Sequence, residues 1–326
     1  MAETVLKVDG LCVDFKINKK NVSAVEGISF SLDKGEILGI VGESGCGKSV
    51  TANAIMGLLP KYTGKISAGS VVLGGKELTT MGEKEQRKVR GKEISMIFQE
   101  PMTSLNPVYT VGSQMVEMAQ SHTKMSKKEA LELSIEMLRK VEIPEPEQRI
   151  KEYPHQLSGG MRQRVMIAMA MMCNPQVLIA DEPTTALDVT IQAQILDLMK
   201  KLRQDNDTAI MLITHDMGVV AEVTDHVMVM YAGQVVEQNT TENVFKHPKH
   251  PYTQGLLKAI PRPDEDAETL YTIPGRVPTL AEMPAGCRFA SRCPYATEKC
   301  ITSAPHLIPC GEGTVRCWKY EEGDNG

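Results

Sequence analysis

A glycine-rich segment near the amino terminus carries the residues with the clearest chemistry. It runs Gly42-Glu-Ser-Gly-Cys-Gly-Lys-Ser49 and matches the pattern G-x-x-x-x-G-K-[ST] at every fixed position. In such a segment, backbone N–H groups curl around phosphate oxygens, the lysine reaches the β- and γ-phosphates, and the hydroxyl coordinates Mg²⁺. The sequence therefore predicts an ATP and Mg²⁺ site formed by Gly42, Ser44, Gly45, Cys46, Gly47, Lys48 and Ser49. The position of Cys46 near a helix N-terminus also predicts a thiol that alkylating reagents modify and that ATP protects.

A pair of acidic residues follows a second apolar run. Val177–Ala180 is continuously apolar, as a buried strand should be, and it delivers Asp181 and Glu182 at its end. With a phosphate loop upstream, we expect Asp181 to bind Mg²⁺ directly or through water. Glu182 is placed to polarise the attacking water. The pair therefore predicts hydrolysis of the bound nucleotide, where alone it would indicate only solvated acids.

The elements that must position these groups alternate between strands and helices. The apolar run EILGIVG leads into the phosphate loop, and a helical stretch that ends at Pro60 leaves it. The runs VLIA and AIMLIT are two further strands separated by the helix IQAQILDLMKKLRQ. This alternation predicts an α/β fold with a largely parallel sheet. Residues 4–32 and 64–78 predict further strands and hairpin turns, and residues 111–142 predict helices with a capping box at Ser126 and Glu129.

Four further segments, in a fixed order, resemble motifs of the ABC ATPases. Leu157-Ser-Gly-Gly-Met-Arg-Gln163 is similar to the family signature, and Gln99 in IFQEP resembles the Q-loop. Ala186-Leu187-Asp188 resembles the D-loop, and His215 in ITHD resembles the switch histidine. The resemblance covers roughly residues 4–245. It implies a P-loop NTPase (RecA-like) core with an antiparallel β subdomain and an inserted helical subdomain at about 101–160.

The resemblance also implies a role for each matched residue. Gln99 and His215 would sense the γ-phosphate and the attacking water, with Gln99 also a Mg²⁺ ligand and the link to a membrane partner. The signature would face the γ-phosphate bound by a second subunit, through Ser158, Gly159 and Gly160, with Asp188 nearby. Phe15 is expected either to stack on adenine, like the family's A-loop aromatic residue, or to be a buried core residue.

The composition changes after about Phe245. Prolines become frequent, long apolar runs disappear, and five cysteines follow: Cys287, Cys293, Cys300, Cys310 and Cys317. We expect an ATPase domain over residues 1–245, followed by a linker and a small Cys-rich module over 246–326. In a reducing cytosol, such a cluster indicates metal ligands before disulfides.

Three segments are similar to the dipeptide, oligopeptide and nickel importer ATPases. They are IFQEPMTSLNPVYTVGSQ, the run from His250-Pro-Tyr-Thr to Pro261, and the closing CRFASRCPYATEKC…VRCW of the peptide-importer extension. Some relatives of that kind are thought to carry an iron–sulfur cluster, which the resemblance assigns to Cys287, Cys293, Cys300 and Cys317. A [4Fe–4S] cluster, Zn²⁺ or free thiols all remain open, and Cys310 does not match the family spacing.

Charge and hydropathy restrict the partners. A net charge of −5 argues against nucleic acid. The amino terminus lacks the pattern of a secretory signal, and no run approaches the ~18 apolar residues of a spanning helix, so a membrane role would come through a partner. The resemblance implies a peripheral subunit at the cytoplasmic face of the membrane that powers peptide import. Its partners would be two permeases, an extracellular peptide-binding protein and a second, related ATPase in a heterodimer.

Three alternatives remain beside peptide import. The cargo could instead be nickel or another small solute. A soluble ABC ATPase acting on DNA or ribosomes would need long coiled coils between Lys48 and Ser158 or a second phosphate loop, and the sequence has neither. The Cys-rich module could also be a redox or metal sensor, alongside transport.

Overall fold

The computed structural model describes residues 3–99, 104–185, 187–260 and 271–321. These residues form two compact units, each built from several stretches of the chain. The first lies within residues 1–6, 32–36 and 73–212 and is called the helix-rich unit here. The second lies within residues 7–31, 37–72 and 213–326 and is called the phosphate-loop unit.

The phosphate-loop unit begins with a hairpin sheet. Strand β1 (Thr4–Ile17) and strand β2 (Lys20–Asp33) are joined by only two residues. Asn18 and Lys19 both have positive φ, 49° and 65°, as a tight hairpin turn of the primed type requires. Strand β4 (Gly64–Leu73) lies on the other side of β1. The predicted short strands therefore form one small sheet, with Phe15 near the end of β1.

A second sheet of this unit carries the phosphate loop. Strand β3 (Ile37–Val41), buried along its whole length, pairs in parallel with β9 (His226–Tyr231). Strand β10 (Gln234–Thr240) pairs antiparallel with β9. Helices α1 (Lys48–Ile55), α9 (Met217–Val223), α10 (Thr241–Lys246) and α11 (Pro251–Lys258) complete this part of the unit.

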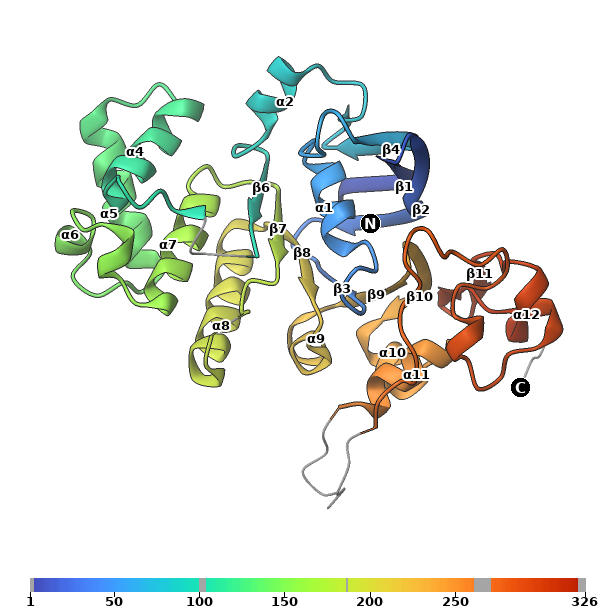
Figure 1. Cartoon of the computed structure of the whole chain (residues 1–326). Helices are drawn as coiled ribbons and strands as arrows, with labels where there is room; N and C mark the ends of the chain where they lie inside the picture. The colour runs from blue at the N-terminus through green and yellow to red at the C-terminus, as the bar shows by residue number, and fades with distance from the viewer. Residues whose placement is uncertain (1–2, 100–103, 186, 261–270, 322–326) are drawn as a thin grey trace. The chain divides into compact units, whose positions relative to one another are not determined.

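The carboxyl-terminal segment extends this same sheet (Figure 1). Strand β12 (Gly313–Val315) pairs antiparallel with β10, and β11 (Ile308–Cys310) pairs with β12. The short helices η2 (Ala290–Arg292), α12 (Glu298–Thr302) and η3 (Trp318–Tyr320) lie in the remaining segment. Phe289 is buried with Tyr231 and Tyr252, at ring-centroid distances of 5.2 and 5.4 Å. The segment therefore shares a hydrophobic core with the strands around the phosphate loop.

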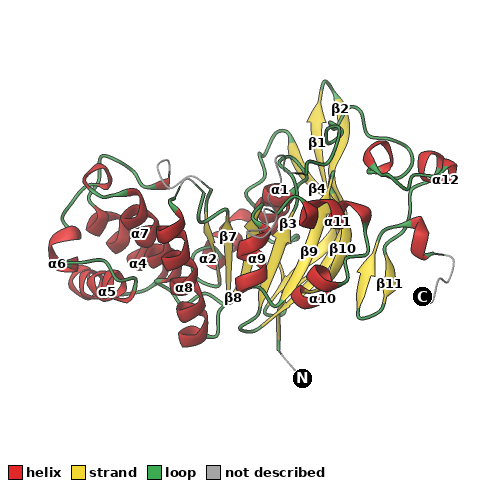
Figure 2. Ribbon diagram, turned by 90° about the horizontal axis from the view of Figure 1, so that it is seen from below, coloured by secondary structure: helices red, strands yellow, loops and turns green. Residues whose placement is uncertain are grey.

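The helix-rich unit combines a short parallel sheet with several helices. Strands β6 (Ile94–Ile97) and β7 (Val177–Asp181) pair in parallel, and β8 (Ala209–Thr214) begins in this unit. Figure 2 shows a group of helices at one end of this unit. Helices whose bounds lie in its described residues include α2 (Glu83–Val89), α4 (Val111–His122), α5 (Lys127–Lys140), α6 (Pro146–Arg149), α7 (Gly159–Met171) and α8 (Val189–Asn206). The short helix η1 (Pro154–Gln156) precedes α7.

The structure confirms the predicted capping box and corrects the predicted end of one helix. The capping box is present, because Ser126 Oγ accepts from the Glu129 N–H at 3.3 Å and Glu129 Oε2 accepts from the Ser126 N–H at 2.7 Å. The helix after the phosphate loop ends at Ile55 and not at Pro60, because Gly57 has a φ of 64° and leaves the helical region first. In the described part of the chain, no helix has the length and apolar character needed to span a membrane.

The predicted domain boundary at residue 245 stays a prediction. The compact units divide the chain differently, since described residues after 245 belong to the same unit as the phosphate loop. The predicted helical subdomain at about 101–160 begins at residues outside the described ones, and α4, α5 and α6 lie within its range.

Candidate active site

Two glycines allow the phosphate loop to turn tightly out of β3. Gly42 has a φ of 152°, and a Cβ there would lie 2.2 Å from the Met230 carbonyl oxygen, so only glycine fits. Gly47 has a φ of 105° and is the N-cap of α1. The loop thus reaches the positive end of a helix, where backbone N–H groups and the helix dipole favour an anion. Ser44 and Gly45 are exposed at the tip of the loop.

The loop's lysine lies folded back onto the loop. Lys48 is buried, with 6% of its surface exposed. Its Nζ donates to the carbonyl oxygens of Gly42 at 2.7 Å and Glu43 at 3.3 Å. These bonds hold the ammonium group inside the curve of the loop, where phosphate oxygens would replace the carbonyls as its acceptors. Ser49 follows at the second helical position and is partly exposed.

The surroundings of the Cys46 thiol do not favour the predicted alkylation. Cys46 has no exposed surface, and burial raises the pKa of its thiol, although Lys48 nearby opposes that shift. A buried, protonated thiol is a poor nucleophile. Its burial therefore argues against ready alkylation, because the side chain points into the packed side of the loop, where it would lie 2.7 Å from a Cβ on Gly42.

Sequence reasoning missed the residues that support this loop from outside. Glu43, a variable position of the loop motif, forms an ion pair with Arg292, and its N–H donates to the hydroxyl of Tyr252. Tyr252 belongs to the HPYT segment noted in the sequence, which was the one available signal. Nothing in the sequence around Arg292 predicted a contact with the phosphate loop, apart from its position beside Cys293.

In the helix-rich unit, the acidic pair lies where predicted, at the end of β7. Asp181 is buried, and Glu182 follows with a φ of 48°, an uncommon backbone region for a non-glycine residue. Gln99 Nε2 donates to Glu182 Oε2 at 2.9 Å, and the Thr185 hydroxyl donates to the same oxygen at 2.8 Å. The structure therefore brings together two residues that the sequence separates by 83 positions. Strained backbone of this kind collects at functional sites.

The signature residues lie at the start of helix α7, and of these Ser158 and Gly159 are exposed. Ser158 is the N-cap, with its hydroxyl accepting from the Met161 N–H at 3.3 Å. A Cβ on Gly159 would lie 3.9 Å from the Leu187 side chain, and one on Gly160 would lie 2.8 Å from that of Ile191. The start of α7 thus lies against the segment that resembles the D-loop. Asp188 caps α8 by accepting from the Ile191 N–H at 2.9 Å, whereas Ala186 lies outside the described residues.

The two remaining predicted nucleotide contacts lie in the phosphate-loop unit. His215 is exposed directly after β8, and the neighbouring Asp216 caps α9 through the N–H groups of Gly218 and Val219. Phe15 is partly buried, and its ring would lie 3.0 Å from a Cβ on Gly64 of β4. A partly exposed ring leaves the predicted stacking role available.

Four of the five carboxyl-terminal cysteines line one cavity. The cavity has a volume of about 360 Å³, and its walls include Cys287, Cys293, Cys300 and Cys317 but not Cys310. The pKa of the Cys287 thiol is raised to about 11, first by burial and further by the neighbouring thiols. Among the described residues, no three His, Cys, Asp or Glu groups converge so as to hold a single metal ion.

Comparisons with known proteins identify the family. Residues 25–185 match the model described as "ABC transporter", and residues 236–300 match that of the "Oligopeptide/dipeptide transporter, C-terminal region". The "Oligopeptide transport ATP-binding protein AppD" of Bacillus subtilis (strain 168) is 55% identical over 320 residues, which is 98% of each chain. The chain belongs to the ABC transporter ATPases. It has the cassette fold of that family, with the extension of the oligopeptide/dipeptide group.

Other members support the same assignment of this ABC ATPase. The "Oligopeptide transport ATP-binding protein OppD" of Escherichia coli (strain K12) is 53% identical over 322 residues, 98% of this chain and 95% of that protein. A solved structure titled "Dimeric structure of a post-hydrolysis state of the ATP-binding cassette MJ0796 bound to ADP and Pi" superposes with a TM-score of 0.64. It is 28% identical and covers 72% of this chain and 98% of its own. ATPases of this family hydrolyse ATP and work with transmembrane permeases in a transport complex.

Proposed function

We propose that this ABC ATPase powers the import of di- and oligopeptides through partner permeases. The observation that carries the proposal is the match of residues 236–300 to the carboxyl-terminal region of oligopeptide/dipeptide transporters. Relatives named for oligopeptide or dipeptide transport also align along 98% of this chain. Import of nickel or another small solute is the alternative within transport.

The proposed role of the phosphate-loop unit is to bind ATP and Mg²⁺. The loop amides and Lys48 hold the phosphates, Ser49 coordinates Mg²⁺, and Phe15 stacks on adenine. The folded-back position of Lys48 supports this assignment, because its ammonium group is already confined to the curve of the loop. His215 acts on the γ-phosphate, and its exposure after β8 leaves it accessible.

The proposed role of the helix-rich unit is to catalyse ATP hydrolysis. Asp181 binds the Mg²⁺ of Mg-ATP, and Glu182 accepts a proton from the attacking water. Gln99 both ligates Mg²⁺ and orients the water, and its 2.9 Å bond to Glu182 supports a shared task. The attacking oxygen forms a bond to the γ-phosphorus while the bond to the β–γ bridging oxygen breaks, releasing ADP and phosphate.

The proposed signature function requires a second subunit. Ser158 and Gly159 are exposed at the start of α7, and backbone N–H groups at a helix N-terminus bind anions well. We propose that they, with Gly160 and Asp188, contact nucleotide held by a related ATPase in a heterodimer. The complex would include two permeases and an extracellular peptide-binding protein, with this chain peripheral at the cytoplasmic face of the membrane.

The test begins with the complex itself. The tagged chain is purified from membranes of its native host, its companions are identified, and the complex is placed in proteoliposomes with labelled pentapeptide or labelled Ni²⁺. We expect two permeases, a second ATPase and a peptide-binding protein, with ATP-dependent uptake of peptide. Uptake of Ni²⁺ alone would favour the alternative cargo, and companions unrelated to membranes would overturn transport.

Glu182→Gln is the matched control for that experiment. Loss of the carboxylate removes the proton acceptor while keeping the shape of the side chain. ATP binding should therefore persist while turnover falls by about 100-fold or more. Near-normal turnover would show that another residue accepts the proton.

The cysteine cavity supports a second, compatible role. We propose that Cys287, Cys293, Cys300 and Cys317 hold an iron–sulfur cluster, because these four thiols line one cavity and are the ones that the resemblance to the peptide-importer extension assigns to it. Four thiolates suit either a [4Fe–4S] cluster or structural Zn²⁺, so the metal content distinguishes the two. When bound, the cluster would cross-link these segments and supply one-electron redox chemistry.

Metal content decides this second role. Anaerobically purified protein should be brown and contain iron and sulfide, and Cys300→Ser should lose both. Cys310→Ser is the matched control and should retain them, since Cys310 does not line the cavity. Colourless protein with stoichiometric zinc would show that the four cysteines bind Zn²⁺ and not a cluster. Folded protein that contains neither iron nor zinc would show that they bind no metal.

A further inference from the structure

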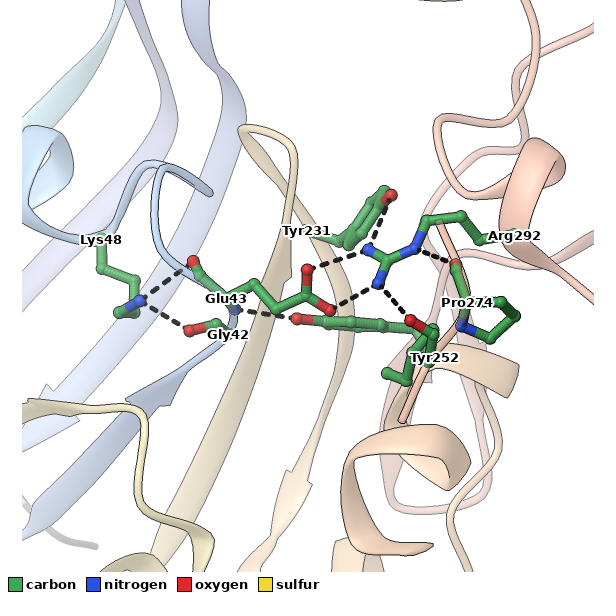
Figure 3. Close-up of polar contacts among 8 residues, drawn as sticks. Gly42, Glu43, Lys48, Tyr231, Tyr252, Pro274 and Arg292 are labelled. Atoms are coloured by element: carbon green, nitrogen blue, oxygen red, sulfur yellow. Dashed lines mark hydrogen bonds and ion pairs between the residues drawn. The ribbon is translucent and has the colours of Figure 1, made fainter. Parts of the chain in front are cut away.

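The carboxyl-terminal segment reaches the phosphate loop through one arginine. The Arg292 side chain is 4% exposed, and both of its terminal nitrogens contact Glu43, Nη1 to Oε2 at 2.9 Å and Nη2 to Oε1 at 3.0 Å. Figure 3 shows this paired contact beside the loop. A bidentate arginine–carboxylate pair fixes the orientation of both groups and is stronger than a neutral hydrogen bond. Glu43 is therefore held in one direction, away from the curve of the loop in which Lys48 lies.

The rest of the guanidinium group is fixed by the segment itself. Nε donates to the Pro274 carbonyl oxygen at 2.9 Å, and Nη2 also donates to that of Ile273 at 3.2 Å. Nη1 lies 3.3 Å from the Tyr231 hydroxyl. All three nitrogens thus have partners, so the arginine is a rigid support and not a mobile surface charge.

A second support holds the backbone of the same loop residue. The Tyr252 hydroxyl accepts from the Glu43 N–H at 2.8 Å, and the side chain is fully buried. Tyr252 is itself fixed at the start of α11, because its N–H donates to His250 Nδ1 at 3.1 Å. His250 is buried as well, and its own N–H donates to Glu237 Oε2 at 2.8 Å. Both the side chain and the main chain of Glu43 are therefore anchored by residues after position 250.

Charge makes the arginine the more important of the two supports. Glu43 directly follows Gly42, so its carboxylate lies on the segment that receives three or four negative charges with the nucleotide. Without Arg292, that carboxylate would be uncompensated and free to turn toward the phosphates. Opposite charge at short range offsets this repulsion, and water screens part of the effect because the Glu43 side chain is 30% exposed.

We propose that Arg292 and Tyr252 are positioning residues for ATP binding, through which the carboxyl-terminal segment sets the nucleotide affinity of the phosphate loop. The inference rests on the proposed role of the loop in binding ATP. Neither residue touches the nucleotide, and each acts through Glu43. The segment thus supports the ATP site in addition to any role of its cysteines.

The test measures ATP affinity of the full-length chain by calorimetry without Mg²⁺, so that hydrolysis does not interfere. Arg292→Ala should weaken ATP binding about tenfold, with a raised KM and little change in kcat when Mg²⁺ is present. Arg316→Ala is the matched control. Arg316 is partly buried and also precedes a cavity cysteine, but its side chain contacts the carbonyl oxygens of Val235 and Pro305, so affinity should stay within twofold.

A double variant separates charge from packing. Arg292→Ala combined with Glu43→Gln removes the uncompensated carboxylate, so affinity should return to within about threefold of the wild type. A purely structural role predicts no recovery of affinity when the arginine is still missing. Unchanged affinity in folded Arg292→Ala, an equal loss in Arg316→Ala, or no recovery in the double variant would each overturn the proposal.

Two further variants keep the result interpretable. If Arg292→Ala fails to fold, Tyr252→Phe tests the second support, since it removes only the hydroxyl and should weaken ATP binding about threefold; unchanged affinity would contradict the proposal.

Lys48→Ala tests the loop itself. If that variant still binds ATP normally, the assigned nucleotide site is wrong, which is a different failure from an inactive Arg292.

Discussion

The phosphate loop and the signature are both glycine-containing turns into a helix, yet they are built in opposite ways. Around the loop, Gly42, Cys46 and Lys48 are buried, and residues from distant segments hold Glu43. At the signature, Ser158 and Gly159 are exposed, and the support comes from the local cap and the neighbouring Leu187 and Ile191. The phosphate loop is supported by residues of its own unit, whereas the signature is an open helix end.

This difference indicates where each site finds its ligand. A loop that already confines its lysine loses little conformational freedom when it binds a nucleotide. An exposed helix N-terminus offers N–H groups to an anion brought by another molecule. The comparison therefore supports binding of ATP by the phosphate loop of one chain and contact with its γ-phosphate by the signature of another.

The largest expected effect is on ATP binding by the isolated chain, which should depend on the phosphate loop and not on the signature. Lys48→Ala should weaken ATP binding by the isolated chain by about 100-fold or more, because the loop loses its buried cation. Ser158→Arg should leave that binding within about threefold, yet abolish most ATP hydrolysis in the assembled complex. Calorimetry and a phosphate-release assay measure the two quantities. An equal loss of binding in both variants would mean that the signature contacts nucleotide within its own chain.

A pair of glycine substitutions compares the packing of the two sites. Gly42→Ala should lower the free energy of unfolding by about 2–3 kcal/mol, because the new Cβ meets a backbone oxygen that cannot move aside. Gly159→Ala should change it by no more than about 0.5 kcal/mol, since its Cβ meets only ordinary contact and alanine favours a helix. Thermal unfolding without nucleotide measures both. A mild Gly42→Ala variant would show that the loop is less rigidly packed than described.

The smallest effect concerns the thiol inside the loop. Cys46 should react with iodoacetamide at pH 8 at least about tenfold more slowly in the folded protein than in the urea-unfolded chain. Burial removes access and raises the pKa of the thiol, so less thiolate is present at this pH than in the unfolded chain. Peptide mapping by mass spectrometry reports the rate at this one cysteine. Equal rates would mean that the loop opens readily and resembles the exposed signature.

The local part of each site could be predicted from sequence because the residues that determine its geometry lie within the motif itself. The spacing from Gly42 to Ser49 reflects a turn followed by a helix start, and both lie where expected. The capping box at Ser126 and Glu129 is equally local and is confirmed. The bond between Gln99 and Glu182 agrees with a shared task that only the family resemblance had suggested.

The remaining features depend on contacts between distant residues. The orientation of Cys46 is set by packing against Gly42, which overrides the general effect of a helix N-terminus on thiols. The ion pair of Glu43 and Arg292 joins positions 249 residues apart, and neither residue belongs to a fixed motif position. Strand β12 is only three residues long, so its pairing with β10 leaves almost no pattern in the sequence.

The separation between Glu43 and Arg292 also has a consequence for synthesis of the chain. The ribosome synthesises Glu43 249 residues before Arg292, and the β12 strand follows later still. A nascent chain that does not yet contain β12 would therefore expose the edge of β10, a template for aggregation. It would also bind ATP poorly. Tight binding of nucleotide would then mark a chain that extends past Arg292, so that ATP in the cell preferentially stabilises chains of at least this length.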